Sequence, residues 1–144
     1  MVKKLERLFW VIIIILVLID QTLKAIILKY QPHLNLKVFT IDFVQNTGAG
    51  FGILKGQTLF LAIISIVVAI IVIYYYYHNQ FEKYPTILLA TFTGGIIGNF
   101  LDRAIRNYVI DFIDFKFWPA FNFADACISL SVIGLIIFFW KEEE

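Results

Sequence analysis

Residues 59–77, LFLAIISIVVAIIVIYYYY, decide the class of fold. Ser65 is the only clearly polar side chain in this run. A helix rises about 1.5 Å per residue, so about 20 mostly apolar residues cross the hydrocarbon core of a bilayer. We therefore expect these residues to form a membrane-spanning helix that faces lipid.

The rest of the chain has the same character. Of its 144 residues 60% are apolar and 16% are charged, and its mean hydropathy is +0.82. Soluble domains are about 45–50% apolar, so this composition excludes a soluble globular protein. Three more windows are long and apolar enough to span, at about residues 9–28, 85–105 and 121–140. We expect an all-α membrane protein whose residues 1–144 form a single polytopic domain.

Charge and cysteine content narrow the possible functions. The net charge of +1 provides no basic field for nucleic acid, and the single cysteine, Cys127, excludes an internal disulfide. Four spans place both termini on one side of the membrane. Lys3, Lys4 and Arg7 cluster before the first helix, which usually sets orientation, so we expect both termini in the cytoplasm.

The two outer loops differ from the tight inner connection at residues 78–84. The first, residues 29–56, alternates weakly over residues 34–38 and 39–43, which predicts short strands at the membrane surface. The second, residues 106–120, is extended and aromatic.

Polar side chains gather in the outer half of the predicted helices, and such groups are candidates for a functional site. Asp20 and Lys24 are four residues apart on one helix face, which favours an ion pair. The run GGIIGNFLDR at residues 94–103 has three glycines that allow close helix approach. Asn99 and Arg103 share a face of that helix, beside Asp102, and Arg103 can pair with a carboxylate or hold a backbone carbonyl.

Two carboxyl groups at the outer ends of the helices suggest acid–base chemistry. Asn122 followed three residues later by Asp125 is typical of a helix cap, and the helix N-terminus favours the ionised form of Asp125. Asp111 lies in an apolar stretch that is expected to raise its pKa. Such a pair shares a proton and can use one member as base and the other as acid. Asp114 is an alternative acid, although in an extended segment it points to the opposite face from Asp111.

Taken in order, these motifs resemble lipoprotein signal peptidase, also called signal peptidase II, of bacteria. The resemblance runs from the first helix to the last and rests on the following segments: Asp20 and Lys24, NTGAGFG at 46–52, GGIIGNFLDR at 94–103, VIDF at 109–112 and FNFAD at 121–125. The chain departs from the family pattern at Gly50, where alanine is usual, and in the short segment between Asp111 and Asp125.

The resemblance implies an intramembrane aspartic endopeptidase in the bacterial cytoplasmic membrane, with four helices, cytoplasmic termini and an active site toward the outer face. It implies a small β-cradle in the first outer loop and a short gating helix in the second. Asp111 and Asp125 would be the catalytic pair. Residues that bind substrate or support the site would be Asn46, Gly48, Asn99, Arg103, Asn122, Asp20, Lys24 and Asp102.

The same resemblance implies the partners. The substrate would be a prolipoprotein that carries diacylglycerol on a cysteine, and cleavage would occur just before that cysteine. The protein would be a monomer among membrane lipids, inhibited by globomycin, with no metal, cofactor or nucleic acid.

Two other functions fit a small membrane protein with buried acids. A proton-coupled transporter needs a polar path through the inner half of the membrane, and residues 59–77 offer none. A non-enzymatic assembly or lipid-binding protein would tolerate Asp111→Asn, whereas a peptidase would not.

Overall fold

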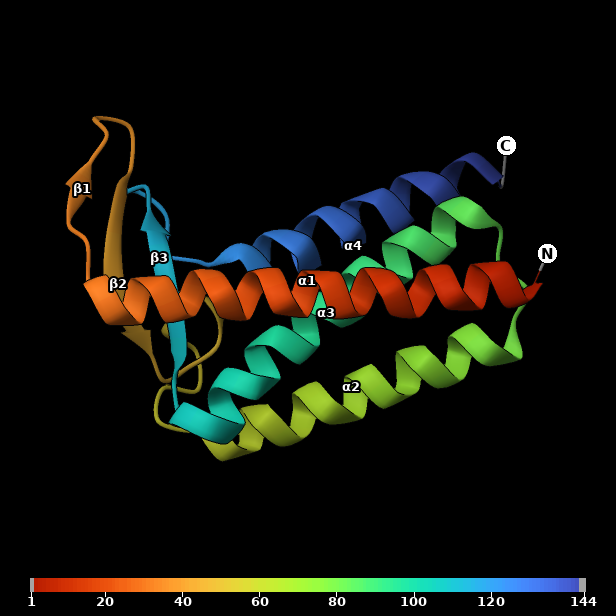
Figure 1. The fold of residues 1–144 in the computed structure, drawn as a ribbon, viewed down its shortest axis with the longest axis horizontal. Helices are drawn as coiled ribbons and strands as arrows, with labels where there is room; N and C mark the ends of the chain where they lie inside the picture. Colours follow the sequence, from red (N-terminus) through yellow and green to blue (C-terminus); the bar gives the residue numbers. More distant parts are fainter. Residues whose placement is uncertain (1, 143–144) are drawn as a thin grey trace.

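The computed structural model describes residues 2–142, which form four long helices and a small sheet (Figure 1). The helices are α1 (Val2–Tyr30), α2 (Thr58–His78), α3 (Lys83–Arg106) and α4 (Phe123–Glu142). Each is long and apolar enough to cross a membrane, as predicted. α1 extends beyond its predicted window at both ends, because hydropathy marks the part that fits in hydrocarbon and not the ends of the helix.

The helix α3 is the centre of the bundle and packs against each of the other three. Of its most apolar window 56% is buried within the protein, against 22% or less in α1, α2 and α4. This arrangement leaves α3 surrounded by helices while the other three face outward. The glycine-rich sequence of α3 is therefore an adaptation to contacts on several sides.

Two glycines of α3 allow the closest approaches. A Cβ on Gly95 would lie 2.6 Å from the carbonyl oxygen of Ala124 in α4, and a Cβ on Gly98 would lie 2.6 Å from Oδ2 of Asp20 in α1. Both distances are shorter than carbon and oxygen atoms tolerate, so side chains here would push the helices apart. The expectation that these glycines serve close helix packing is confirmed.

A three-stranded antiparallel sheet covers one end of the bundle (Figure 1). Its order is β1 (Leu34–Asn35), β2 (Thr40–Asn46) and β3 (Val109–Asp114). β1 and β2 come from the first outer loop, as expected, but β3 comes from the second. Val44 of β2 stands opposite Asp111 of β3.

The prediction of a gating helix in the second outer loop is wrong. Residues 115–122 form bends and a β-bridge in the structure, and the short helical turn η1 (Gly50–Gly52) lies in the first outer loop instead. The segment between β3 and α4 is too short for a helix. β3 pairs with β2 as far as Asp114, and the eight residues that then return to α4 must cross the sheet edge, where Ile113 bridges Phe121.

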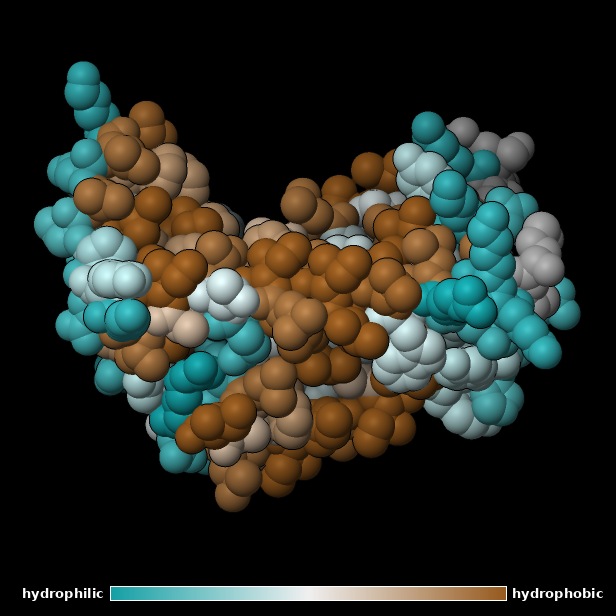
Figure 2. Space-filling view, viewed as in Figure 1, coloured by the Kyte–Doolittle hydropathy of each residue, from teal (hydrophilic) through white to brown (hydrophobic). Residues whose placement is uncertain are grey.

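The surface agrees with a membrane location. Figure 2 shows a broad apolar band across the middle of the helices, with hydrophilic residues concentrated at the two ends. Leu59, Ile70 and Ile71 of α2 are more than half exposed, and so are Leu130 and Ile136 of α4. A soluble protein does not expose so large a continuous apolar area, whereas lipid covers it at no cost.

We predict that Gly95→Ala will destabilise the bundle by about 1–3 kcal/mol, since the new methyl group meets the backbone of α4. Thermal unfolding of the purified protein in detergent measures the effect. Gly134→Ala is the matched control, because its Cβ would meet only the side chain of Leu88, which can rotate away. Equal losses in the two variants would contradict the role assigned to Gly95.

Candidate active site

Asp111 lies on β3, where the sheet meets the ends of the helices, and only 1% of its surface is exposed. Asn46 Nδ2 donates a hydrogen bond of 2.9 Å to its Oδ2, and Asn122 Nδ2 donates one of 2.7 Å to its Oδ1. Burial, followed by the negative charge of Asp125, raises the pKa of Asp111 to about 7, and the two amide hydrogen bonds oppose the rise. The direction of this shift agrees with the prediction from the sequence.

Asp125 lies in the first turn of α4 and forms the predicted cap with Asn122. The backbone N–H of Asp125 donates to Asn122 Oδ1 at 3.0 Å, and the backbone N–H of Asn122 donates to Asp125 Oδ2 at 3.1 Å. This reciprocal pair is a capping box in which asparagine and aspartate replace the usual residues. The remaining oxygen, Asp125 Oδ1, accepts a hydrogen bond of 2.7 Å from Asn99 Nδ2.

Two asparagine amides connect the two carboxyl groups. Asn122 Nδ2 donates to Asp111 Oδ1 and also, at 3.1 Å, to Asn99 Oδ1. Asn99 in turn donates to Asp125. A continuous chain of hydrogen bonds thus runs from Asp111 through both amides to Asp125. Side chains from β3, α3 and α4 meet here, although they are far apart in the sequence.

A layer of buried charges supports the amides. Lys24 Nζ lies 2.9 Å from Asp20 Oδ2 and 3.0 Å from Asp102 Oδ2, and all three side chains are 1% exposed or less. The predicted pair of Asp20 and Lys24 is confirmed, and Asp102 completes it as a group of three. Lys24 Nζ also donates 2.9 Å to Asn99 Oδ1, which turns the other end of that amide toward Asp125.

The two acids of this layer also hold backbone groups beside the carboxyl pair. Asp20 Oδ1 accepts the N–H of Ala124 at 3.2 Å, next to Asp125. Asp102 Oδ2 accepts the N–H of Ile110 at 3.0 Å, next to Asp111. The charged layer therefore fixes the backbone on both sides of the site.

Sequence reasoning missed two members of this layer. Gln21 Nε2 donates to Asp20, to Asp102 and to the carbonyl of Gly98, each at 3.1 Å. Arg106 Nη1 lies 2.6 Å from Asp102 Oδ1 and donates 3.1 Å to Gln21 Oε1. Arg106 stands four residues after Asp102 on one face of a helix, and that spacing is the signal that would have found it. Nothing in the sequence separates Gln21 from an ordinary polar residue within a membrane-spanning helix.

Arg103 and Gly48 connect the helices to the first outer loop. Arg103 Nη2 donates 3.3 Å to the carbonyl of Gly48, one of the two partners considered for it from the sequence, and its buried Nε has no hydrogen-bond partner among the described residues. Gly48 N–H donates to Asn46 Oδ1 at 2.9 Å, and a Cβ at Gly48 would lie 2.8 Å from the carbonyl oxygen of Ile53. Gly48 thus holds Asn46 in a turn that leaves no room for a side chain.

A cavity of about 530 Å³ opens beside Asp125. Its lining includes Asn46, Arg103 and Asp125, together with Ile128 and Leu130 on α4. Leu130 is 66% exposed, on the surface that we assign to lipid. The cavity therefore joins a polar floor to an apolar wall.

The structure places Asp114 apart from this arrangement. Asp114 is partly exposed, and its Oδ1 accepts a hydrogen bond from the backbone N–H of Lys116 at 2.8 Å. The structure joins the ten residues predicted for the site in one network, through the direct contacts given above. Asp114 has no part in this network.

Four apolar helices, with two hydrogen-bonded carboxyl groups where the sheet meets the helix ends, are the features of an intramembrane enzyme of the aspartic type. The chain belongs to the signal peptidase (SPase) II family, whose model matches residues 12–141.

Named relatives agree. A lipoprotein signal peptidase of Halothermothrix orenii is 32% identical over 140 residues, which cover 94% of this chain and 97% of the relative. One of Caldanaerobacter subterraneus is 42% identical over 133 residues, with 88% and 90% covered. A solved bacterial membrane enzyme, determined by the in meso method at 2.3 Å resolution, superposes with a TM-score of 0.88 at 29% identity, covering 94% of this chain and 89% of that one. The protein is thus a bacterial membrane peptidase, which decides against a transporter or a non-enzymatic lipid-binding protein.

We predict that Lys24→Met will destabilise the protein by about 3–5 kcal/mol, because Asp20 would remain buried without its cation and Asp102 would keep only Arg106. Thermal unfolding in detergent reports the loss. Lys29→Met, at the exposed end of the same helix, removes the same group as a control and is expected to have little effect. If Lys24→Met unfolds at the temperature of the wild type, the charged layer does not hold the helices together.

Proposed function

We propose that Asp111 and Asp125 are the catalytic acid and base of this peptidase. Membership of the family means that the enzyme removes signal peptides from prolipoproteins. The observation that carries the assignment is the chain of amide hydrogen bonds that joins the two carboxyl groups through Asn122 and Asn99. This connection holds both carboxyls at one place, while Asp114 is bonded within its own loop.

The two carboxyls have different environments, and we assign their roles from that difference. Asp111, whose pKa is about 7, is the member that carries the shared proton. Asp125 lies at the positive end of the α4 dipole and accepts hydrogen bonds on both oxygens, so we expect it to be the carboxylate. Each Asp125 oxygen keeps a further lone pair for a water molecule.

Hydrolysis then proceeds in two proton-balanced steps. As a water oxygen attacks the scissile carbonyl carbon, Asp125 takes a proton from the water and Asp111 gives its proton to the carbonyl oxygen, which forms a tetrahedral diol. Asp125 next gives its proton to the amide nitrogen as the C–N bond breaks, and Asp111 takes a proton from a hydroxyl group as the new carboxyl forms. Both residues return to their starting states.

The cavity beside Asp125 supports a lipid-modified substrate. Its α4 wall is exposed to the surroundings of the helices, so a peptide with acyl chains can reach Asp125 laterally while the chains remain in lipid. Arg103 lines the cavity, and its guanidinium group provides hydrogen-bond donors for a substrate carbonyl. We propose a diacylglyceryl prolipoprotein as substrate, cleaved before the lipidated cysteine, and globomycin as an inhibitor that occupies the same cavity.

The orientation and assembly complete the proposal. Both chain ends lie at the end of the bundle away from the sheet (Figure 1), and the cluster of Lys3, Lys4 and Arg7 lies at that same end. We propose that this end faces the cytoplasm and that the carboxyl pair lies toward the outer face. A monomer suffices, because one chain supplies every residue of the site described above.

We predict that Asp111→Asn and Asp125→Asn will each reduce cleavage by about a thousandfold or more while the protein stays folded, since an amide cannot move the shuttled proton. The double variant is expected to be as inactive as either single one, because the pair acts as a unit. The assay follows cleavage of a diacylglyceryl-modified precursor by the purified enzyme, with the unmodified precursor in parallel. Asp114→Asn, the matched control, is expected to keep most of its activity. Loss of cleavage in Asp114→Asn together with activity in Asp111→Asn would overturn the assignment of the catalytic pair. Cleavage of the unmodified precursor at the same rate as the modified one would overturn the proposal of a lipid-modified substrate.

We also predict a bell-shaped dependence of kcat/KM on pH. Asp111 must be protonated to act as acid, so activity falls as pH rises through about 7, where its carboxyl group ionises. Activity falls at low pH as Asp125 becomes protonated and can no longer accept a proton from water. Initial rates between about pH 5 and 9 measure the profile, and enzyme returned to neutral pH before assay controls for unfolding. A rate that stays constant through the neutral range would show that Asp111 is not the acid.

A further inference from the structure

A second and larger cavity, of about 850 Å³, lies between the first turns of α1 and the segment that connects α2 to α3. Its lining residues are Lys4, Leu5, Arg7, Leu8, Val11 and residues 80–83. It shares no residue with the carboxyl site, which lies by the sheet at the other end of the bundle. The proposed peptidase activity therefore does not account for it.

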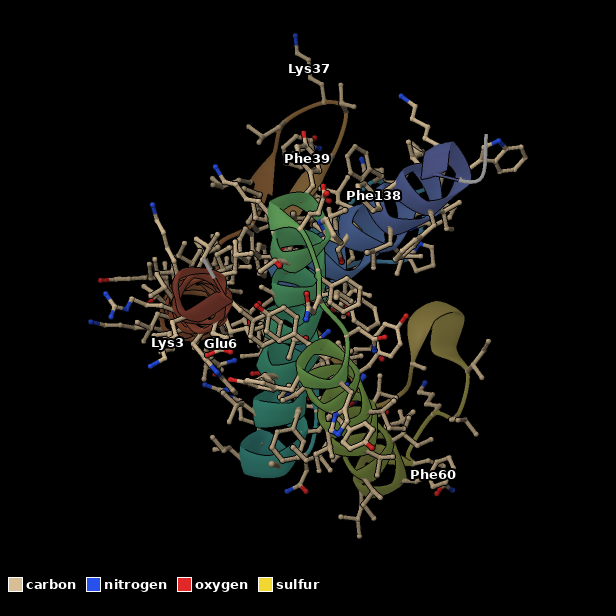
Figure 3. All side chains as sticks on the ribbon, turned by 90° about the vertical axis from the view of Figure 1, so that its right-hand side faces the viewer. Lys3, Glu6, Lys37, Phe39, Phe60 and Phe138 are labelled. Atoms are coloured by element: carbon tan, nitrogen blue, oxygen red, sulfur yellow. The ribbon has the colours of Figure 1, made fainter. Side chains whose placement is uncertain are left out.

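The cavity carries an unbalanced positive charge. Lys4, Arg7 and Lys83 line it and are exposed, and Glu82 is its only acidic lining residue. None of the three cations forms an ion pair with a side chain of residues 3–50 or 52–141, the part of the chain whose side chains the structure describes. Glu6, the nearest other acid in the sequence, is partly buried and lines a separate, smaller cavity. Figure 3, which looks onto this end of the bundle, shows Lys3 pointing outward from α1 and Glu6 on the side that faces the other helices.

The N-terminus of α3 adds to the positive potential. The helix begins at Lys83, and the side chain of its N-cap residue, Glu82, makes no capping hydrogen bond. The partial positive charge of a helix N-terminus is therefore directed at the same opening. An anionic group fits here better than a zwitterionic one, because the opening has more cations than anions to neutralise.

The deeper part of the cavity is apolar and follows α1 toward the middle of the membrane. Lys4, Leu8 and Val11 have the spacing of one helix face, and Val11 lies about 10 Å farther along the helix than Lys4. Leu8 is partly buried and Val11 is 43% exposed. The occupant must therefore be anionic at one end and apolar along the other, at the depth where lipid headgroups meet acyl chains.

We propose that this cavity binds an anionic phospholipid of the adjacent leaflet. Lys4, Arg7 and Lys83 hold its phosphodiester, and one acyl chain lies along Leu8 and Val11. Under the orientation proposed above, the leaflet is the cytoplasmic one. The lipid would bind at the end of the enzyme opposite the site of cleavage and join α1 to the start of α3.

The test uses the full chain purified in a neutral detergent and titrated with phosphatidylglycerol or phosphatidylcholine. Native mass spectrometry counts retained lipids, and the rise in Tm measures stabilisation by the bound lipid. We expect phosphatidylglycerol to bind preferentially. Each lysine or arginine near an anionic surface strengthens binding about fivefold, so Lys4→Gln, Arg7→Gln and Lys83→Gln together are expected to weaken it on the order of a hundredfold.

Matched variants separate this site from general electrostatics. Lys37→Gln, Lys55→Gln and Lys116→Gln remove the same charge from the outer loops and are expected to leave lipid binding unchanged. Lys83→Gln alone is expected to weaken binding about fivefold, and Lys4→Arg with Lys83→Arg to preserve it. Because the three cations make no contacts with the site, precursor cleavage in detergent is expected to stay at the wild-type rate in the triple variant, which also shows that it is folded.

Three results would overturn the proposal. Equal binding of phosphatidylcholine would show that the cavity has no preference for an anionic headgroup. An equal loss of phosphatidylglycerol binding in the variant with the three outer-loop substitutions would show that binding depends only on the total charge of the protein. An equal rise in Tm with inorganic phosphate alone would assign the cations to a free anion rather than to a lipid.

Discussion

A charged side chain within the hydrocarbon of a membrane is stable only with partners, and Lys24 is the clearest example in this protein. Its ammonium group has two carboxylate partners, Asp20 on its own helix and Asp102 on α3. Because none of the three is solvated, separating α1 from α3 would expose uncompensated charge to an apolar medium. The same two acids accept backbone N–H groups of Ala124 and Ile110. One buried ion group thus fixes the relative positions of three helices and a strand.

The chemistry of the site follows from this arrangement. Asn99 accepts from Lys24 through its oxygen, so its nitrogen must face Asp125. Asn122 caps α4 with its oxygen and is left with its nitrogen for Asp111. Each amide therefore has one possible orientation, and neither carboxyl depends on a flexible partner. Placing one acid on a strand and the other in a helix cap gives the pair unequal environments, which is the condition for one to donate a proton while the other accepts one.

The two ends of the bundle differ in a way that hydropathy alone does not reveal. Near the sheet, polar side chains are turned inward and paired, as Asp111 and Asn122 illustrate. At the other end, Lys4 and Arg7 are exposed and form no ion pair with the side chains that the structure describes. Inward polar groups are typical of chemistry that must exclude bulk water, and outward cations are typical of contact with a charged membrane surface. The interior between them is sealed by apolar packing, including the stacked rings of Phe9 and Tyr76, whose centroids are 4.0 Å apart.

The sequence alone determined the four helices, the ion pair of Asp20 with Lys24 and the cap formed by Asn122 with Asp125. Each of these features depends on hydropathy or residue spacing within one segment. The raised pKa of Asp111 was also predictable in direction, since its apolar neighbours are adjacent in sequence. Only the tertiary structure decided which elements meet. It brought Asp111 to the amides of distant segments, added Gln21 and Arg106 to the charged layer, and paired residues 109–114 with β2 as a third strand. Such contacts depend on how helices cross and strands pair, and a single sequence does not encode those geometries in any local pattern.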